Sequence, residues 1–103
     1  MKLISSQKFL NQEVVQEKIQ NEDFEVQVSP VFNIDGTDYQ VILDGHHSYH
    51  AAIQSGNCPD FIEQDVMDND NIQLLLDGNI EDFLLTVYVD SDYYDVSTGV
   101  SIF

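Results

Sequence analysis

The sequence contains no arginine and no tryptophan, and its 103 residues include one cysteine, two prolines and three lysines. A single cysteine excludes an intrachain disulfide and is typical of a reducing compartment. No segment approaches the roughly 20 consecutive apolar residues of a membrane-spanning helix. The first residues also lack the apolar centre of a signal peptide. We therefore expect a cytoplasmic protein that does not enter a membrane, and its length fits a single domain over 1–103.

Acidic residues dominate the charge. The chain has 19 Asp and Glu residues and a formal net charge of −16. All three lysines lie in residues 1–20, so residues 21–103 carry 17 acids and no base. Proteins that bind nucleic acids use Lys and Arg to neutralise phosphates, so this balance argues against direct nucleic-acid binding. Solubility needs far less charge. The excess of negative charge therefore indicates that the charge itself serves the function of the protein. Two simpler alternatives are adaptation to a salt-rich cytoplasm and plain solvation of an acidic domain.

Apolar spacing and turn residues predict the elements in chain order. The spacing predicts an amphipathic helix over 10–20 with Asn11 as its N-cap. An extended segment over 26–32 follows, broken at a proline. Asp35-Gly36 predicts a hairpin turn because it supplies the positive φ that such a turn requires, and a strand over 39–43 comes next. The remaining predicted elements are a glycine turn at Gly45, a helix over 46–55 ending at Gly56, a short strand or turn over 61–66, a helix over 71–77, a strand over 83–89 and a hairpin over 93–103.

Two stretches around the predicted hairpin carry a resemblance. They read V-S-P-V-F at 28–32 and D-G-H-H-S-Y-H-A-A at 44–52, and the chain resembles the ParB/sulfiredoxin family in these motifs and in the order of its elements over 10–66. The resemblance implies an α+β fold with a small mixed sheet and helices. Residues 68–103 have no counterpart in the family, and we expect them to form an acidic C-terminal extension of the same domain, with one helix and strands.

The resemblance also implies a nucleotide site at Gly45, His46, His47 and Ser48, where the family's glycine turn and helix N-terminus hold phosphates. Free N–H groups and the positive end of a helix dipole favour an anion there. Ser48 stands at the family's arginine position, and the chain has no arginine to form a bidentate phosphate clamp. Sulfiredoxins carry their nucleophilic cysteine at the position of His46, whereas Cys58 lies beyond the predicted helix. We expect a degenerate motif that binds CTP or ATP weakly or not at all.

The histidines suggest a second chemistry. His46 and His50 are four residues apart and share one helix face, with Asp44 nearby, which is one possible arrangement of metal ligands. A third strong ligand is not evident, and the acid clusters lack the glycine and final acid of an EF-hand loop. We therefore expect histidines on the surface or anchoring turns, with no metal and no cofactor. We expect His47 to face the sheet or a backbone carbonyl, and Cys58 to be a small buried hydrophobe.

Two functions from different classes fit these observations. The first is a non-enzymatic inhibitor that mimics DNA and blocks a nucleic-acid-binding protein of host defence, as small phage anti-restriction and anti-CRISPR proteins do. Sixteen charges correspond to about 27 Å of duplex. The second is a ParB-like nucleotide-binding or nuclease domain in which His46, His47 and His50 replace the missing arginine. An unassigned acidic interaction protein is the remaining alternative.

The inhibitor hypothesis assigns the partner-facing surface to the acids of the C-terminal part of the chain. They carry most of the charge where the family resemblance explains nothing. They are Asp60, Glu63, Asp65, Asp68, Asp70, Asp77, Glu81, Asp82, Asp90, Asp92 and Asp95.

Overall fold

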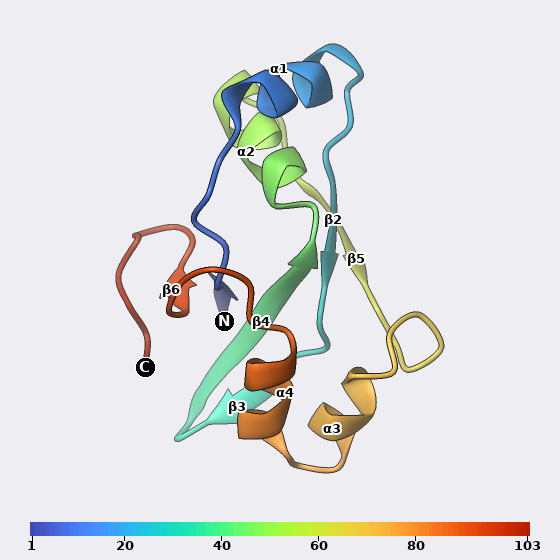
Figure 1. Cartoon of the computed structure of the whole chain (residues 1–103), viewed down its shortest axis with the longest axis vertical. Coiled ribbons are helices and arrows are strands. Elements are labelled where there is room, and N and C mark those ends of the chain that lie inside the picture. The colour runs from blue at the N-terminus through green and yellow to red at the C-terminus, as the bar shows by residue number, and fades with distance from the viewer.

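The computed structural model describes residues 1–103 and shows an α+β fold with a mixed six-stranded sheet and four helices (Figure 1). None of the helices has the length and apolar character that a membrane crossing requires. The elements are, in chain order, β1 (Lys2–Ser5), α1 (Gln12–Gln20), β2 (Glu25–Val28), β3 (Phe32–Ile34), β4 (Thr37–Asp44), α2 (His46–Ser55), β5 (Asp60–Glu63), α3 (Ile72–Leu76), α4 (Ile80–Thr86) and β6 (Tyr94–Asp95).

Strand β4 is the centre of the sheet, whose order is β5-β2-β4-β1-β6. β1 runs parallel to β4, while β2 and β3 pair antiparallel with different parts of it. Between β2 and β3, the Ser29 N–H donates to the Val41 carbonyl at 2.9 Å, and the Ser29 hydroxyl accepts from the Val41 N–H at 3.0 Å. The serine hydroxyl thus satisfies a strand N–H just before Pro30, which has no N–H of its own to donate.

The turns predicted from the sequence are confirmed. Asp35 and Gly36 have φ values of 51° and 89° and join β3 to β4, as a primed hairpin turn requires. Asn11 caps α1, because its Oδ1 accepts from two N–H groups of the first turn. Gly45 and Gly56 bound α2 in left-handed conformations.

Alternate residues of β4 face two separate cores. Tyr39 and Val41 belong to the large core, which α3 and α4 cover, and Ile42 belongs to the small core. The large core consists of Ile4, Phe32, Tyr39, Val41, Ile72, Leu75, Phe83 and Tyr93, and the small core of Val26, Val28 and Ile42. Helices α1 and α2 lie together at the opposite end of the long axis from α3 and α4 (Figure 1).

The strand predicted over 83–89 is wrong, because most of this segment lies in α4. Aromatic and β-branched residues favour a strand locally, but the apolar residues follow a helical period that begins three positions earlier. They recur at i, i+3, i+4 and i+7 and pack in or against the large core: Ile80, Phe83, Leu84 and Val87. Burial of this stripe outweighs the local strand propensity.

The C-terminal part holds two short helices and one two-residue strand, instead of the predicted single helix and several strands. The helix predicted over 71–77 is confirmed as α3. The predicted terminal hairpin is reduced to β6 and a single bridge between Tyr94 and Ser101. β6 pairs antiparallel with β1. Ser6 directly follows β1, and its carbonyl accepts hydrogen bonds from the N–H groups of Asp90 and Ser91, which hold the segment before β6 in place. β6 therefore pairs with β1 on one edge. On its other edge a short form of the predicted hairpin remains, in which the Asp95 N–H donates to the Val100 carbonyl and the Ile102 N–H to the Tyr93 carbonyl.

Candidate functional site

Gly45 joins β4 to α2 with a φ of 90°, a backbone angle that residues with a side chain rarely adopt. A Cβ atom at this position would lie 2.5 Å from the carbonyl oxygen of Glu25 and 2.9 Å from the Cα of Val26. The close approach of β2 therefore requires glycine here for packing alone. The glycine of the resemblance motif therefore has a structural reason that involves no ligand.

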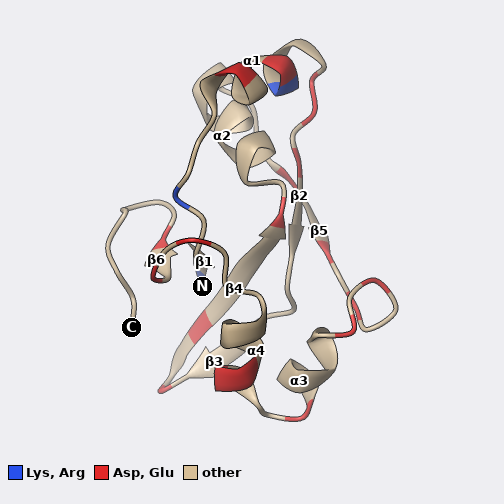
Figure 2. Cartoon of the chain, viewed as in Figure 1, with Lys and Arg blue, Asp and Glu red and all other residues tan.

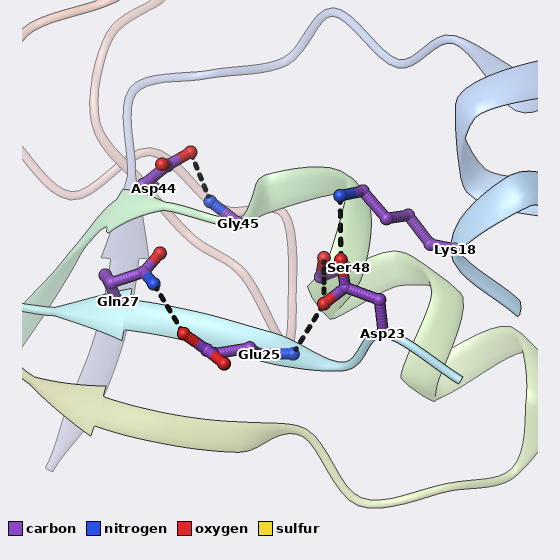
Figure 3. Close-up of polar contacts among 7 residues, drawn as sticks. All are labelled: Lys18, Asp23, Glu25, Gln27, Asp44, Gly45 and Ser48. Atoms are coloured by element: carbon purple, nitrogen blue, oxygen red, sulfur yellow. Dashed lines mark hydrogen bonds and ion pairs between the residues drawn. The ribbon is translucent and has the colours of Figure 1, made fainter. Parts of the chain in front are cut away.

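A small cavity of about 220 Å³ lies beside Gly45, and only polar residues and the glycine line it (Figure 3). The Lys18 ammonium forms an ion pair with Asp23 at 2.9 Å, and the Ser48 hydroxyl donates to the same carboxylate at 3.4 Å. The Lys18 contact holds the pKa of Asp23 below its usual value. The Gly45 N–H donates to the Asp44 carboxylate at 2.8 Å. The full lining is Lys18, Asp23, Glu25, Gln27, Asp44, Gly45 and Ser48.

Carboxylate side chains line this cavity, at the place where a phosphate was expected to bind. Asp23, Glu25 and Asp44 face one lysine, so the lining has three negative groups and one positive group, a formal charge of −2. No side chain caps the first turn of α2, so its positive end favours anions. The protein's own carboxylates already lie beside that end, and an external phosphate would meet their repulsion.

The four residues predicted to hold a nucleotide are not gathered around one cavity. Gly45 and Ser48 line the small cavity, whereas His46 and His47 do not. His46 is 3% exposed, and neither of its ring nitrogens has a hydrogen-bond partner. The expectation of a surface or turn-anchoring histidine is therefore wrong for His46, which the first turn of α2 carries into the interior.

His47 connects the two N-terminal helices. Its Nε2 accepts a hydrogen bond from the Asn11 N–H at 3.1 Å, at the residue that caps α1. The ring therefore contacts a backbone N–H at the start of α1, where we expected the sheet or a backbone carbonyl. This bond requires an unprotonated Nε2. His47 serves as an anchor between α1 and α2.

Burial lowers the pKa of two histidines of α2, His46 and His50. Loss of hydration, together with the neighbouring rings of His50 and His47 and against an opposing effect of Asp90, lowers the pKa of His46 to about 4. The His46 and His50 ring centroids lie 4.7 Å apart. Burial also lowers the pKa of His50. No group of three or more His, Cys, Asp or Glu residues is arranged to hold a metal ion.

The buried His46 predicts a pH-dependent stability. Its pKa falls on folding, so the unfolded chain binds a proton first as the pH drops, and the native state loses stability below about pH 6.5. We expect the free energy of unfolding to fall by about 2 kcal/mol between about pH 7.5 and pH 5 on this account. Urea unfolding of the wild type and of His46→Leu measures it, since the variant keeps every carboxylate. Equal pH dependence of the two proteins would contradict the prediction.

Cys58 is exposed, so the expectation of a buried thiol is wrong. It lies in the connection between Gly56, which ends α2, and β5, where no element covers it.

Ten of the eleven acids predicted to face a partner are exposed, and Asp95 is half-buried. Five of these carboxylates accept hydrogen bonds within the protein: those of Asp65, Asp68, Asp77, Asp90 and Asp95. Acidic segments extend from α1 at one end of the molecule to α4 at the other (Figure 2). The carboxylates with no hydrogen-bond donor within the protein are exposed, and they are those of Asp60, Glu63, Asp70, Glu81, Asp82 and Asp92.

Sequence reasoning missed a groove of about 790 Å³ beside α4. Its outer wall includes Leu85 and Tyr88, both at least half exposed. The signal was present in the sequence, because these residues follow Glu81 at i+4 and i+7, the spacing of one helix face, although α4 ends at Thr86 before Tyr88. Prediction of a strand over 83–89 concealed it.

No protein-family model matches the chain, and no curated protein or solved structure matches it either.

Proposed function

We propose that this chain is an acidic, non-enzymatic inhibitor that mimics DNA and blocks a nucleic-acid-binding protein of host defence, in the manner of phage anti-restriction or anti-CRISPR proteins. The observation that carries the proposal is the unpaired acidic surface. Lys18 and Asp23 form the one ion pair in the protein, which leaves 18 of the 19 acids without a basic partner. An internal stabilising role does not explain so many uncompensated charges, since their mutual repulsion opposes folding.

The dimensions support imitation of a duplex. The molecule measures 40 × 30 × 22 Å. Its 16 net charges over the 40 Å axis amount to about one per 2.5 Å, whereas duplex DNA carries about one per 1.7 Å. The acids occupy elements along that whole axis (Figure 2). A protein that reads phosphate positions would therefore meet a comparable density of negative charge.

The alternative is a ParB-like nucleotide-binding or nuclease domain. The uncapped N-terminus of α2 next to Gly45 favours it. The carboxylates of Asp23, Glu25 and Asp44 in the adjoining cavity argue against it, because they repel the phosphates that such a domain must hold. Ser48, at the family's arginine position, donates to Asp23 and presents no positive charge.

Competition with DNA tests the proposed function. The chain is immobilised, a bacterial lysate is applied at low salt, and bound protein is eluted with a short DNA duplex or with polyglutamate of equal total charge. We expect the duplex to release a protein that polyglutamate leaves bound, and that protein should retard duplex DNA in a gel shift. The chain itself should give no gel shift, because it lacks the cations that bind phosphates.

Two outcomes would overturn the proposal. In the first, polyglutamate releases the same proteins as the duplex, which would reveal simple ion exchange. In the second, the chain alone binds duplex DNA with an affinity that falls as salt is added, which would favour the nuclease alternative.

A further inference from the structure

A groove runs between α4, the β3–β4 turn and the C-terminal segment, and its floor belongs to the large core. Ile80, Leu84 and Tyr93 line it, and all three pack in or against that core. The Tyr93 hydroxyl donates to the Leu84 carbonyl at 2.7 Å, which fixes the floor to α4. The floor is therefore a rigid apolar surface.

The walls of the groove are apolar and uncovered. Leu85 is 75% exposed, Tyr88 is 50% exposed and Phe103 is 59% exposed. The Phe103 ring packs against the rings of Tyr39 and Tyr93, and its centroid lies 5.8 Å from that of Tyr39 and 6.2 Å from that of Tyr93. The segment over 80–88 is thus apolar on two sides: one stripe enters the large core, while Leu85 on α4 and Tyr88 just beyond its end remain at least half exposed. Contiguous exposed apolar surface of this kind marks interaction sites.

Negative charge surrounds this apolar surface. Asp35, Glu81 and Asp92 line the groove, and no lysine does. None of the three carboxylates accepts a hydrogen bond or forms an ion pair within the protein. An occupant that is itself apolar and acidic would be repelled, and this argues against a second copy of the chain with its charge of −16. The charge pattern selects an occupant with apolar side chains flanked by cations.

We infer that this groove binds about two turns of a basic, amphipathic helix on the partner protein, an inference that rests on the proposed function. A helix is about 10 Å across and rises 1.5 Å per residue, so a volume of about 790 Å³ matches roughly seven residues. Many DNA-binding proteins place a basic helix in the major groove. The same helix would set its apolar residues against Leu85 and Tyr88 and its Lys or Arg residues against Glu81 and Asp92.

Synthetic peptides test the groove without the partner. The first is a labelled helical peptide with Leu at i, i+3, i+4 and i+7 and with Lys or Arg at the other positions. The second replaces those Leu residues with Ala, and the third replaces Lys and Arg with Gln. Fluorescence anisotropy measures their binding to the full chain. We expect the first peptide to bind most tightly, because the second loses apolar burial and the third loses attraction to the acidic rim.

Matched variants locate the binding. Leu85→Gln should weaken the first peptide about tenfold, whereas Phe9→Gln should leave it unchanged, because Phe9 is 66% exposed but lies outside the groove. Glu81→Gln should weaken it more than Glu13→Gln on α1. Thermal melts verify that each variant remains folded. Equal binding by the Leu85 and Phe9 variants, or equal binding of the Leu and Ala peptides, would overturn the inference.

The two proposals fail in different ways. If the Leu85→Gln chain still captures a duplex-eluted protein at full strength while the peptides show no preference, the groove inference fails and the proposed function stands. If no duplex-eluted protein exists but the first peptide binds at Leu85, the proposed function fails and the recognition of basic helices by the groove stands.

Discussion

Replacement of Phe83 with alanine is expected to lower the free energy of unfolding by about 3–5 kcal/mol. Phe83 is fully buried and is the largest fully buried side chain of the protein. Its ring lies edge-on to Phe32, with centroids 6.3 Å apart, so it connects α4 to β3 across the large core. Since domains of this size are stable by only about 5–15 kcal/mol, such a loss removes a large part of the total. Urea unfolding at fixed salt measures it.

Leu85→Ala on the same helix is the matched control. Leu85 is 75% exposed, so its loss should change the free energy of unfolding by about 0.5 kcal/mol or less. If residues 83–89 formed a strand, Phe83 and Leu85 would share one face and their substitutions would have comparable effects. A cost at Leu85 close to that at Phe83 would therefore contradict the helix.

The sequence predicted the elements that depend on residues with a special local conformation. Asp35-Gly36 supplies two positive φ values, and Gly45 and Gly56 supply one each at the ends of α2. Asn11 caps α1 through bonds to the next turn. Such features are determined by neighbours in the chain, so one sequence is enough to predict them.

Long-range contacts account for what sequence reasoning could not predict. The small cavity at Gly45 contains Asp23 and Glu25, which precede it by about 20 positions and approach it only through the pairing of β2 with β4. His46 is buried although a helix N-terminus usually faces solvent. The α4 segment has mixed propensity, and the large core decides its conformation. In each case, a distant partner supplies the energy that outweighs the local pattern.

The central claim is that the acids of the C-terminal part attract the partner. Glu63, Asp70 and Asp82 are exposed, and their carboxylates accept no hydrogen bond within the protein. They also lie outside the apolar groove. Joint replacement by Gln, Asn and Asn should lower the association rate with the duplex-eluted protein about tenfold at low salt, because electrostatic steering depends on charge near the contact. The variant should also reduce the dependence of that rate on salt, while relief of repulsion keeps or raises its thermal stability.

A triple variant on and beside α1 is the matched control, in which Glu13, Glu17 and Glu22 become Gln. These acids are also exposed, and both variants change the formal net charge from −16 to −13. Association rates measured over a range of salt concentrations for the wild type and both variants test the claim most directly. We expect slower, less salt-dependent association for the first variant and a rate within about threefold of wild type for the second. Equal slowing of both, or of neither, would contradict a DNA-mimicking surface in the C-terminal part of the chain.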